Sequence, residues 1–155
     1  MSIKSRVLAI AGAAALTTGI ALAGTAQAET VIELTQTGCQ FVESEGVDHG
    51  YTPKTADDCK EINAESGEDR ATKAVTLRLK PGKHIFRVTN ENVPYELGFW
   101  LRGDGLISRA TLPSVSGGGL TQGVTKDYVV DLEPGEYLYS CPLNPTLDYK
   151  LVVEG

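Results

Sequence analysis

An all-β fold, an antiparallel β-sandwich, is the fold class that the sequence predicts. Short runs in which apolar and polar residues alternate recur along the chain, most of them in its second half. Proline, glycine and asparagine separate these runs at short intervals. Several short strands divided by turn residues are typical of two packed antiparallel sheets. The predicted strands are 31–35, 74–80, 84–90, 94–102, 125–132, 136–141 and 149–153.

Two of the predicted turns resemble each other. The segments LKPGKHIFRV and LEPGEYLYSC each place Pro-Gly between two strand-like runs. Proline presets the first corner of a β-turn and glycine accepts the positive φ of the second, so Pro81-Gly82 and Pro134-Gly135 are expected to turn the chain. The likeness predicts two similar hairpins.

Two segments lack strand periodicity. Residues 103–124 contain Pro113 and three consecutive glycines, Gly117 to Gly119, and read as a loop. Residues 39–72 are polar and charged without an apolar period, apart from a short helical signal over 57–62. We expect this second segment to be a long polar loop insertion in the sandwich, of the kind that carries function or needs a staple.

The three cysteines are Cys39, Cys59 and Cys141. A Cys39–Cys59 disulfide would staple the insertion and, in the chain-entropy model, stabilise the fold by roughly 3 kcal/mol. The alternative is that both thiolates bind a metal. Either way the odd number leaves Cys141 without a cysteine partner in the same chain.

Residues 1–28 have the parts of a secretory signal peptide. Lys4 and Arg6 precede a mostly apolar run from Val7 to Ala23, and Ala26-Gln27-Ala28 forms an A-x-A cleavage site. Because the apolar run is short for a bilayer span, we expect the peptide to be removed rather than to anchor the chain. Residues 29–155 are then a single exported domain, periplasmic or secreted, with no membrane anchor, in a compartment where disulfides persist.

The mature domain is acidic. Lys4 and Arg6 are two of the 14 basic residues, so residues 29–155 keep 12 basic residues against all 20 acidic ones, a net charge of −8. A surface of this sign argues against nucleic acid or an anionic membrane as a partner. A protein partner or a small ligand remains compatible with it.

Two segments resemble the cupredoxins, the plastocyanin-like blue copper proteins. They are Asn90-Glu-Asn-Val-Pro-Tyr-Glu-Leu97 and Gly135-Glu-Tyr-Leu-Tyr-Ser-Cys141-Pro. The likeness covers roughly residues 74–155 and the first strand, and residues 39–72 have no counterpart. It implies a Greek-key sandwich of cupredoxin type. In that family an N-x-x-x-P-H stretch supplies one histidine, C-x-x-H supplies the thiolate and a second histidine, and a methionine follows as a weak axial ligand.

This sequence departs from the copper pattern at three of four ligands. Tyr95 follows Pro94 where the family has histidine, and Asn144 stands three residues after Cys141 where the family has the other. No methionine occurs after Met1. A blue copper centre uses a thiolate and two imidazoles because this mixed set suits both copper oxidation states. We therefore expect the family's fold without its standard copper site.

Two histidines remain as candidate ligands. His84 starts a strand at the end away from Cys141, roughly 20 Å off at 3.3 Å per residue, and is expected to be an exposed strand residue. His49 lies in the insertion, so the strands do not determine its position. An atypical metal site would combine Cys141 with His49 and with Tyr95, Asn144 or a nearby acid. The other interpretation is that Cys141 is a buried small hydrophobe and that Tyr95 and Asn144 fill the vacated pocket with their own hydrogen bonds.

Two functions follow from these interpretations. The first is a binding or interaction module that holds no cofactor and recognises a protein or small ligand through its loop end and residues 39–72. The alternative is an atypical copper-binding protein, an electron-transfer protein or copper carrier, that uses Cys141 with His49 or the other cysteines. Neither places a base next to a nucleophile, so we do not expect an enzyme.

Overall fold

The computed structural model describes residues 29–155, and the predicted signal peptide, 1–28, lies outside the described residues. The strands are β1 (Thr30–Thr37), β2 (Gln40–Phe41), β3 (Leu77–Leu79), β4 (Gly82–Asn90), β5 (Leu97–Gly103), β6 (Val115–Leu120), β7 (Thr125–Leu132), β8 (Gly135–Ser140) and β9 (Tyr149–Val153). The helices are α1 (Val42–Glu45), α2 (Ala56–Lys73) and α3 (Gly105–Thr111).

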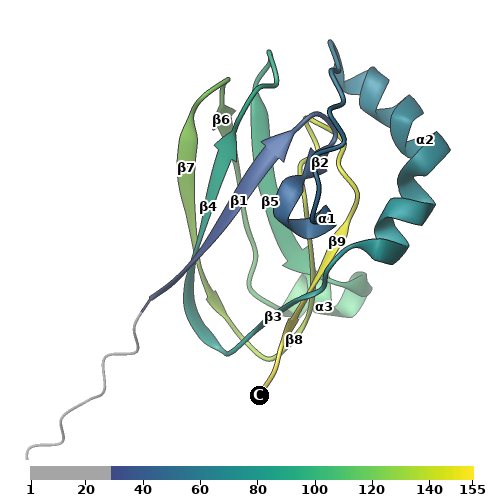
Figure 1. Ribbon diagram of the computed structural model, residues 1–155. Coiled ribbons are helices and arrows are strands. Elements are labelled where there is room, and N and C mark those ends of the chain that lie inside the picture. Colours follow the sequence, from purple (N-terminus) through teal and green to yellow (C-terminus); the bar gives the residue numbers. More distant parts are fainter. Residues whose placement is uncertain (1–28) are drawn as a thin grey trace, which may run out of the picture.

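Two sheets pack face to face and enclose the core (Figure 1). One has the strand order β2-β1-β4-β7 and the other the order β3-β9-β8-β5-β6. The alternation in the sequence determines which side chains face inward. Along β7, for example, Tyr128, Val130 and Leu132 are buried while the residues between them are exposed. Aromatic rings join the layers, since the ring centroids of Phe86 and Phe99, from opposite sheets, lie 5.3 Å apart. The β-sandwich is therefore confirmed.

The prediction that its sheets are antiparallel is wrong, because each sheet contains one parallel pair. β1 runs parallel to β4, from Thr30 opposite His84 to Gln36 opposite Asn90. β3 runs parallel to β9, with Leu77 opposite Leu151. Alternation assigns side chains to a face but says nothing about strand direction, which depends on where the connections run.

The two Pro-Gly segments do turn the chain, but they do not make hairpins. The first leads from β3 in the five-stranded sheet to β4 in the four-stranded sheet, and the second leads from β7 back to β8. The flanking strands therefore pair with other partners and lie in different layers. Their similarity in sequence reflects two crossings between the sheets at the same end of the sandwich (Figure 1).

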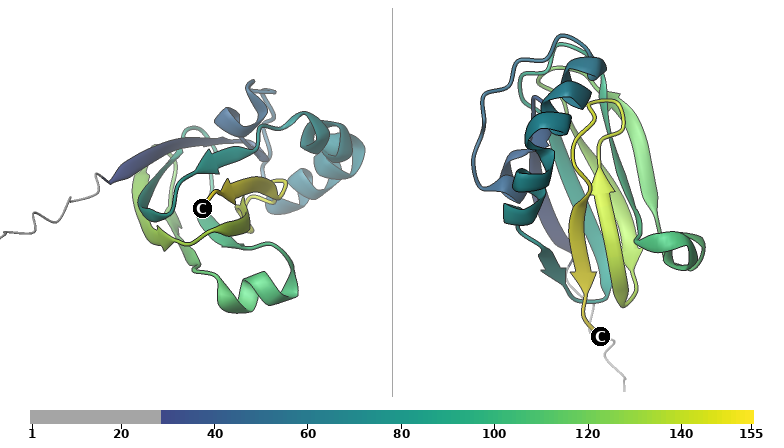
Figure 2. Two further views of the ribbon diagram at one scale, coloured as in Figure 1. Left: turned by 90° about the horizontal axis from the view of Figure 1, so that it is seen from below. Right: turned by 90° about the vertical axis from the view of Figure 1, so that its right-hand side faces the viewer.

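The insertion at residues 39–72 is mostly structured, which corrects its description as a long loop. It contains β2, α1 and most of α2, an 18-residue helix along the side of the sandwich (Figure 2). Thr55 and Asp58 form a capping box at its start. Only Cys59, Gly67 and Arg70 of α2 are buried, so the helix has no apolar stripe to reveal its period. Within residues 29–155, no helix is long and apolar enough to cross a membrane.

Residues 103–124 also contain regular structure where a loop was expected. The short helix α3 follows β5, and the glycine-rich stretch forms β6, which pairs with β5. A β-carbon at Gly103 would lie 2.2 Å from the carbonyl oxygen of Ser108, so glycine lets α3 approach the end of β5. β5 itself starts at Leu97 rather than at Pro94, because the preceding residues belong to the turn that Asn90 organises.

His84 is buried, with 5% of its surface exposed, and the expectation of an exposed residue is wrong. It follows the inward alternation of β4 together with Phe86 and Val88. Its Nε2 lies 2.8 Å from the carbonyl oxygen of Lys80. The side chain therefore belongs to the end of the sandwich where the Pro-Gly segments cross.

Candidate functional site

The loop end of the sandwich, at the top of Figure 1, brings together Tyr95, Cys141 and Asn144. Cys141 directly follows β8, Asn144 lies in the loop before β9, and Tyr95 lies just before β5. These segments meet because β5 begins at the end where β8 finishes, as their antiparallel pairing requires.

The sulfur of Cys141 is enclosed by backbone donors. The N–H groups of Gly98 and Asn144 each donate to Sγ at 3.3 Å, and the residue has no exposed surface. Burial raises the pKa of the Cys141 thiol, while hydrogen bonds from the backbone of Gly98, Asn144 and Leu143 act in the opposite direction. The net shift is upward, so the group is a protonated thiol at neutral pH.

Asn144 is the centre of a group that we call the polar plug, formed by Tyr95, Asn144 and the Cys39–Cys59 disulfide. Its Oδ1 accepts hydrogen bonds from the Tyr95 hydroxyl at 3.2 Å and from the backbone N–H of Cys39 at 3.2 Å. Its Nδ2 donates to the carbonyl oxygen of Thr37 at 3.1 Å. Asn144 is fully buried. Both Oδ1 and Nδ2 of its side chain have hydrogen-bond partners within the protein, without a charged group or a ligand.

Asn90 holds the loop that carries Tyr95. Its side-chain nitrogen lies 3.1 Å from the carbonyl oxygen of Val93 and 3.2 Å from that of Tyr95, and its Oδ1 accepts the N–H of Val93 at 2.9 Å. Burial raises the pKa of the Tyr95 hydroxyl, and the nearby Cys141 and Asp58 raise it further. Tyr95 therefore stays a neutral donor to Asn144.

The Cys39–Cys59 disulfide is present, as predicted. It does more than close the insertion, because it packs against the other two members of the polar plug, Tyr95 and Asn144. Sγ of Cys59 lies 3.0 Å from Oδ1 of Asn144 and 3.9 Å from the Tyr95 hydroxyl. A disulfide sulfur carries no proton, so these are packing contacts. Sequence reasoning missed this proximity because no pattern relates position 59 to position 144.

His49 lies in a second polar group, the ion-pair cluster, which consists of Glu45, His49, Arg70 and Tyr149. Arg70 donates to both carboxylate oxygens of Glu45, through Nε at 2.8 Å and Nη2 at 2.7 Å. Nε2 of His49 lies 2.8 Å from Oε2 of Glu45, and the Tyr149 hydroxyl donates to Oε1. The structure thus places His49 with Glu45 rather than with Cys141.

The ion pair of this cluster is buried, with 2% of the Glu45 side chain and 4% of the Arg70 side chain exposed. Burial alone would raise the pKa of Glu45. Hydrogen bonds from Arg70, Tyr149 and His49, together with the charge of Arg70, outweigh burial and hold that pKa below its usual range. The sequence offers no signal for this pair, because both residues lie in a segment rich in charges.

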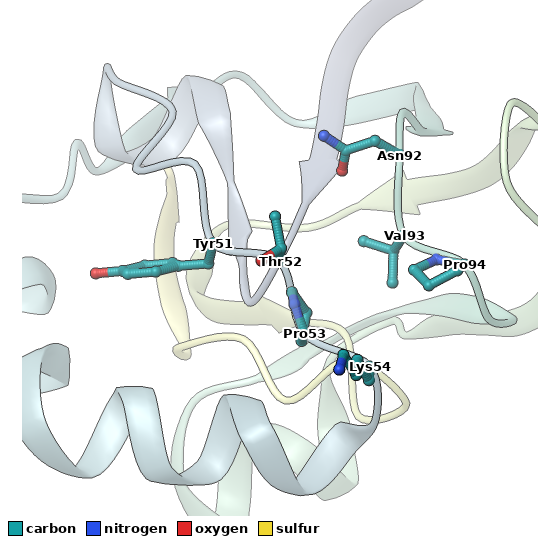
Figure 3. Close-up of a pocket in the computed structure, with 7 residues that line it drawn as sticks. All are labelled: Tyr51, Thr52, Pro53, Lys54, Asn92, Val93 and Pro94. Carbon is teal, nitrogen blue, oxygen red and sulfur yellow. The ribbon is translucent and has the colours of Figure 1, made fainter.

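A groove opens at the loop end, and Figure 3 shows the side chains that line it. Its volume is about 380 Å³, and residues 51–54 of the insertion and residues 92–94 of the β4–β5 connection form its two walls. A β-carbon at Gly38 would lie 2.3 Å from the carbonyl oxygen of Tyr51, so glycine there lets the first wall lie against the β1–β2 turn. The lining residues are Tyr51, Thr52, Pro53, Lys54, Asn92, Val93 and Pro94.

The sequence matches no protein-family model and no curated protein. One similar solved structure is the crystal structure of Lac15 from a marine microbial metagenome, at 14% sequence identity and a TM-score of 0.40. The alignment covers 82% of this chain and 27% of the Lac15 chain, so this chain spans about a quarter of that protein. The similarity is distant.

The side chains at the loop end do not fit a blue copper centre. Cys141 has Asn144 beside it and Tyr95 next to Asn144, where the resemblance implies imidazoles, and the Asn144 amide is already occupied by protein partners. Within residues 29–155, no group of three or more histidine, cysteine, aspartate or glutamate side chains is placed to hold a metal ion.

Proposed function

We propose that this chain is an exported protein with a Greek-key, cupredoxin-like fold, without a type 1 copper site, that acts as a binding module. The observation that carries the proposal is the hydrogen bond of 3.2 Å between Tyr95 and Asn144, at the two positions where the resemblance implies histidine ligands. Because Tyr95 and Asn144 hydrogen-bond each other, their buried polar atoms have partners without a copper ion, and this arrangement supports a stabilising role for the two side chains. The backbone frame around Cys141 persists without the imidazoles.

The remaining histidines also support a role without type 1 copper. His49 contacts Glu45, and His84 contacts the backbone of Lys80 at the opposite end of the sandwich. A protonated thiol with no hydrogen bond to a histidine within residues 29–155 also lacks the pairing of a catalytic nucleophile. We therefore propose a role other than catalysis.

Export is supported by the disulfide, since such bonds persist in the periplasm and outside the cell. The groove between residues 51–54 and 92–94 is the recognition surface that we propose. One wall comes from the insertion and the other from the loop end, so the groove exists because the insertion folds against the sandwich. Its concave shape and mixed apolar and polar lining are typical of ligand sites.

A copper titration of residues 29–155 tests the first part of the proposal. We expect no thiolate-to-copper charge-transfer band from the unmodified domain with either copper oxidation state. A variant with Tyr95→His and Asn144→His should gain such a band, because the sulfur is already held in place. Adding Cys141→Ser to that variant should abolish it. A strong band from the unmodified domain that is lost in Cys141→Ser would contradict the proposal.

That outcome would favour the alternative, an atypical copper-binding protein. One observation supports it: backbone N–H groups converge on the Cys141 sulfur, and such donors also stabilise a thiolate. The site would require Asn144 to release its partners or the disulfide to open. The titration therefore distinguishes the two functions directly.

A selection from a library of short displayed peptides tests the groove. We expect the domain to enrich peptides whose binding is lost in Asn92→Trp, since the indole would fill the space between the walls. The matched control is Asp131→Trp, which adds the same ring at an exposed position at the far end of β7. Enrichment that survives Asn92→Trp, or no enrichment at all, would rule out the groove as a peptide site.

A further inference from the structure

The first wall of the groove, residues 51–54, lies within the loop that the disulfide closes. Cys39 and Cys59 are 20 residues apart, and the wall stands between them in the sequence. Pro53 is buried, and a β-carbon at Gly38 would lie 2.4 Å from its Cδ, so the wall packs closely on the residue before Cys39. The wall and the disulfide therefore meet the sandwich at the same place, the β1–β2 turn.

The first half of α2, which follows the wall directly, has few other attachments to the sandwich. From residue 55 to residue 66, Cys59 is the only buried residue. Asn63 adds a hydrogen bond from its side-chain nitrogen to the carbonyl oxygen of Pro145. The disulfide is therefore the principal link that ties this half of the helix to the β1–β2 turn.

The second half of α2 is attached by the ion-pair cluster. Arg70 forms the buried ion pair with Glu45. The same guanidinium lies 5.1 Å from the centroid of the Tyr51 ring, at the start of the wall. At a rise of 1.5 Å per residue, Arg70 is about 16 Å from Cys59 along the helix axis. Two anchors thus hold the insertion, and only the one at Cys59, next to residues 52–54, depends on the redox state of the chain.

The second wall, residues 92–94, is held from within the sandwich. Asn90, the last residue of β4, accepts the N–H of Val93 at 2.9 Å and donates to its carbonyl oxygen at 3.1 Å. Its side-chain nitrogen also lies 3.0 Å from the carbonyl oxygen of Leu120 on β6. These bonds involve no residue of the insertion. Figure 3 shows the two walls facing each other, so release of the disulfide would free one wall and leave the opposite one in place.

We propose that the Cys39–Cys59 bond controls the groove, which forms in the disulfide state of the chain and is lost in the dithiol state. The groove is the site of the proposed function, on which this inference rests. When the bond opens, residues 52–60 detach from the β1–β2 turn, while the ion-pair cluster keeps Tyr51 and the second half of α2 in place. The chain then binds no ligand in a reducing compartment and gains its site after export, where disulfides persist.

Closure of the groove is a thiol–disulfide exchange with a small disulfide such as oxidised glutathione. The thiolate of one cysteine attacks a sulfur of the small disulfide and releases one thiol, and the other cysteine then displaces the second. Cys39 and Cys59 together lose two protons and two electrons, and the small disulfide becomes two thiols. Dithiothreitol reverses the step and is oxidised to its cyclic disulfide. Both protein sulfurs are buried, so the reductant reaches them only when the first half of α2 opens.

Amide NMR spectra of ¹⁵N-labelled residues 29–155 test the mechanism without a ligand. In the dithiol state, produced with dithiothreitol or mimicked by Cys39→Ser with Cys59→Ser, we expect the signals of residues 52–60 to move to random-coil positions. The signals of β4 and of residues 66–73 should keep their positions, because the second wall and the ion-pair cluster stay intact. Native signals for residues 52–60 would overturn the proposal. So would random-coil signals from β4, since the whole domain would then have unfolded.

Peptide binding tests the consequence for the proposed function. A peptide enriched on the disulfide form should bind the dithiol form at least about tenfold more weakly, since the competent groove is a small fraction of that population. The matched control is Leu132→Ala, which weakens the core at the far end of β7 and should leave the affinity unchanged. Equal affinity of the two forms would overturn this inference and leave the proposed function intact. If no peptide is enriched on the disulfide form, the proposed function fails, and the NMR spectra alone decide the redox mechanism.

Discussion

The polar plug and the ion-pair cluster lie side by side but satisfy their buried groups by different means. The plug is neutral, with Asn144 bonded to Tyr95 and to backbone groups. The cluster is charged, with Arg70 paired to Glu45. Cys39 joins the two, because its N–H donates to Asn144 and its carbonyl oxygen accepts from Arg70 at 3.1 Å. The turn between β1 and β2, which contains Cys39, therefore depends on both a neutral and a charged hydrogen-bond network.

Because one network is charged and the other is neutral, we expect substitutions in the two to lower the free energy of unfolding by different amounts, with the largest loss in the charged ion-pair cluster. Arg70→Ala should lower the free energy of unfolding by about 3–5 kcal/mol, because it leaves the Glu45 carboxylate buried without its partner. Urea denaturation measures the loss. The control is Arg78→Ala, which removes an exposed pair with Glu154 and should cost about 0–1 kcal/mol. Equal costs for the two variants would show that burial does not distinguish the pairs.

Removal of the Cys39–Cys59 disulfide, which belongs to the polar plug, should have the next largest effect on stability. Cys39→Ala with Cys59→Ala should lower the free energy of unfolding by about 3 kcal/mol, since the disulfide spans 20 residues and restricts the unfolded chain. The measurement is urea denaturation of the variant and of the unmodified domain, both without a reducing agent, so that the Cys39–Cys59 bond of the unmodified domain stays intact. A thiol assay of the unfolded, unreduced domain should find only the Cys141 thiol. Three reactive thiols would contradict the disulfide.

Replacing Asn144, the central residue of the polar plug, should lower the free energy of unfolding by less than replacing Arg70 of the ion-pair cluster. Asn144→Ala should cost about 1–3 kcal/mol, because the N–H of Cys39 and the carbonyl oxygen of Thr37 lose their partner. Tyr95→Phe, which removes one neutral hydroxyl, should cost about 0.5–1.5 kcal/mol. Both values come from urea denaturation. A larger cost for Tyr95→Phe than for Asn144→Ala would show that Asn144 is not the centre of the plug.

The smallest expected effect is on the pH dependence of stability, which should involve the ion-pair cluster and not the polar plug. The pKa of Glu45 is lowered in the folded state, so its contribution to stability is complete above its ordinary value of 4.5 and is lost as the pH falls through the folded value. Unfolding free energies measured from neutral to acidic pH should therefore decline less steeply in Glu45→Gln than in the unmodified domain. Asn144→Ala should keep the original slope, because the plug contains no carboxylate. Parallel slopes for Glu45→Gln and the unmodified domain would refute the assignment.

The parts of the fold that were predictable rest on local pattern. Alternation located the strands, as with Tyr128, Val130 and Leu132 on β7. The disulfide followed from two cysteines within a segment that needed a staple. Strand direction could not be predicted in the same way. The residues of β1 alternate identically whether it pairs parallel or antiparallel with β4.

The candidate site likewise contains some residues that local sequence pattern could identify and others that it could not. Tyr95 and Asn144 were recognisable by their positions in a motif, and the structure brings them together. The Glu45–Arg70 pair was not recognisable, because a buried ion pair and a solvated one use the same residues. The full length of helix α2 was not predicted, for a related reason. Because it buries only a cysteine, a glycine and an arginine, its sequence shows no apolar residues repeating at helical spacing.

The parallel pairings have a consequence for how the chain acquires its structure. β1 pairs locally with β2, but its parallel pair with β4 cannot form until residues 82–90 have arrived, and β3 must wait for β9, which lies between β3 and β8 in the sheet. Loop closure over such separations is slow, so we expect these two parallel pairs to form later than the local β1–β2 pair. Among the strands described here β9 comes last in the sequence, and its arrival between β3 and β8 completes the larger sheet.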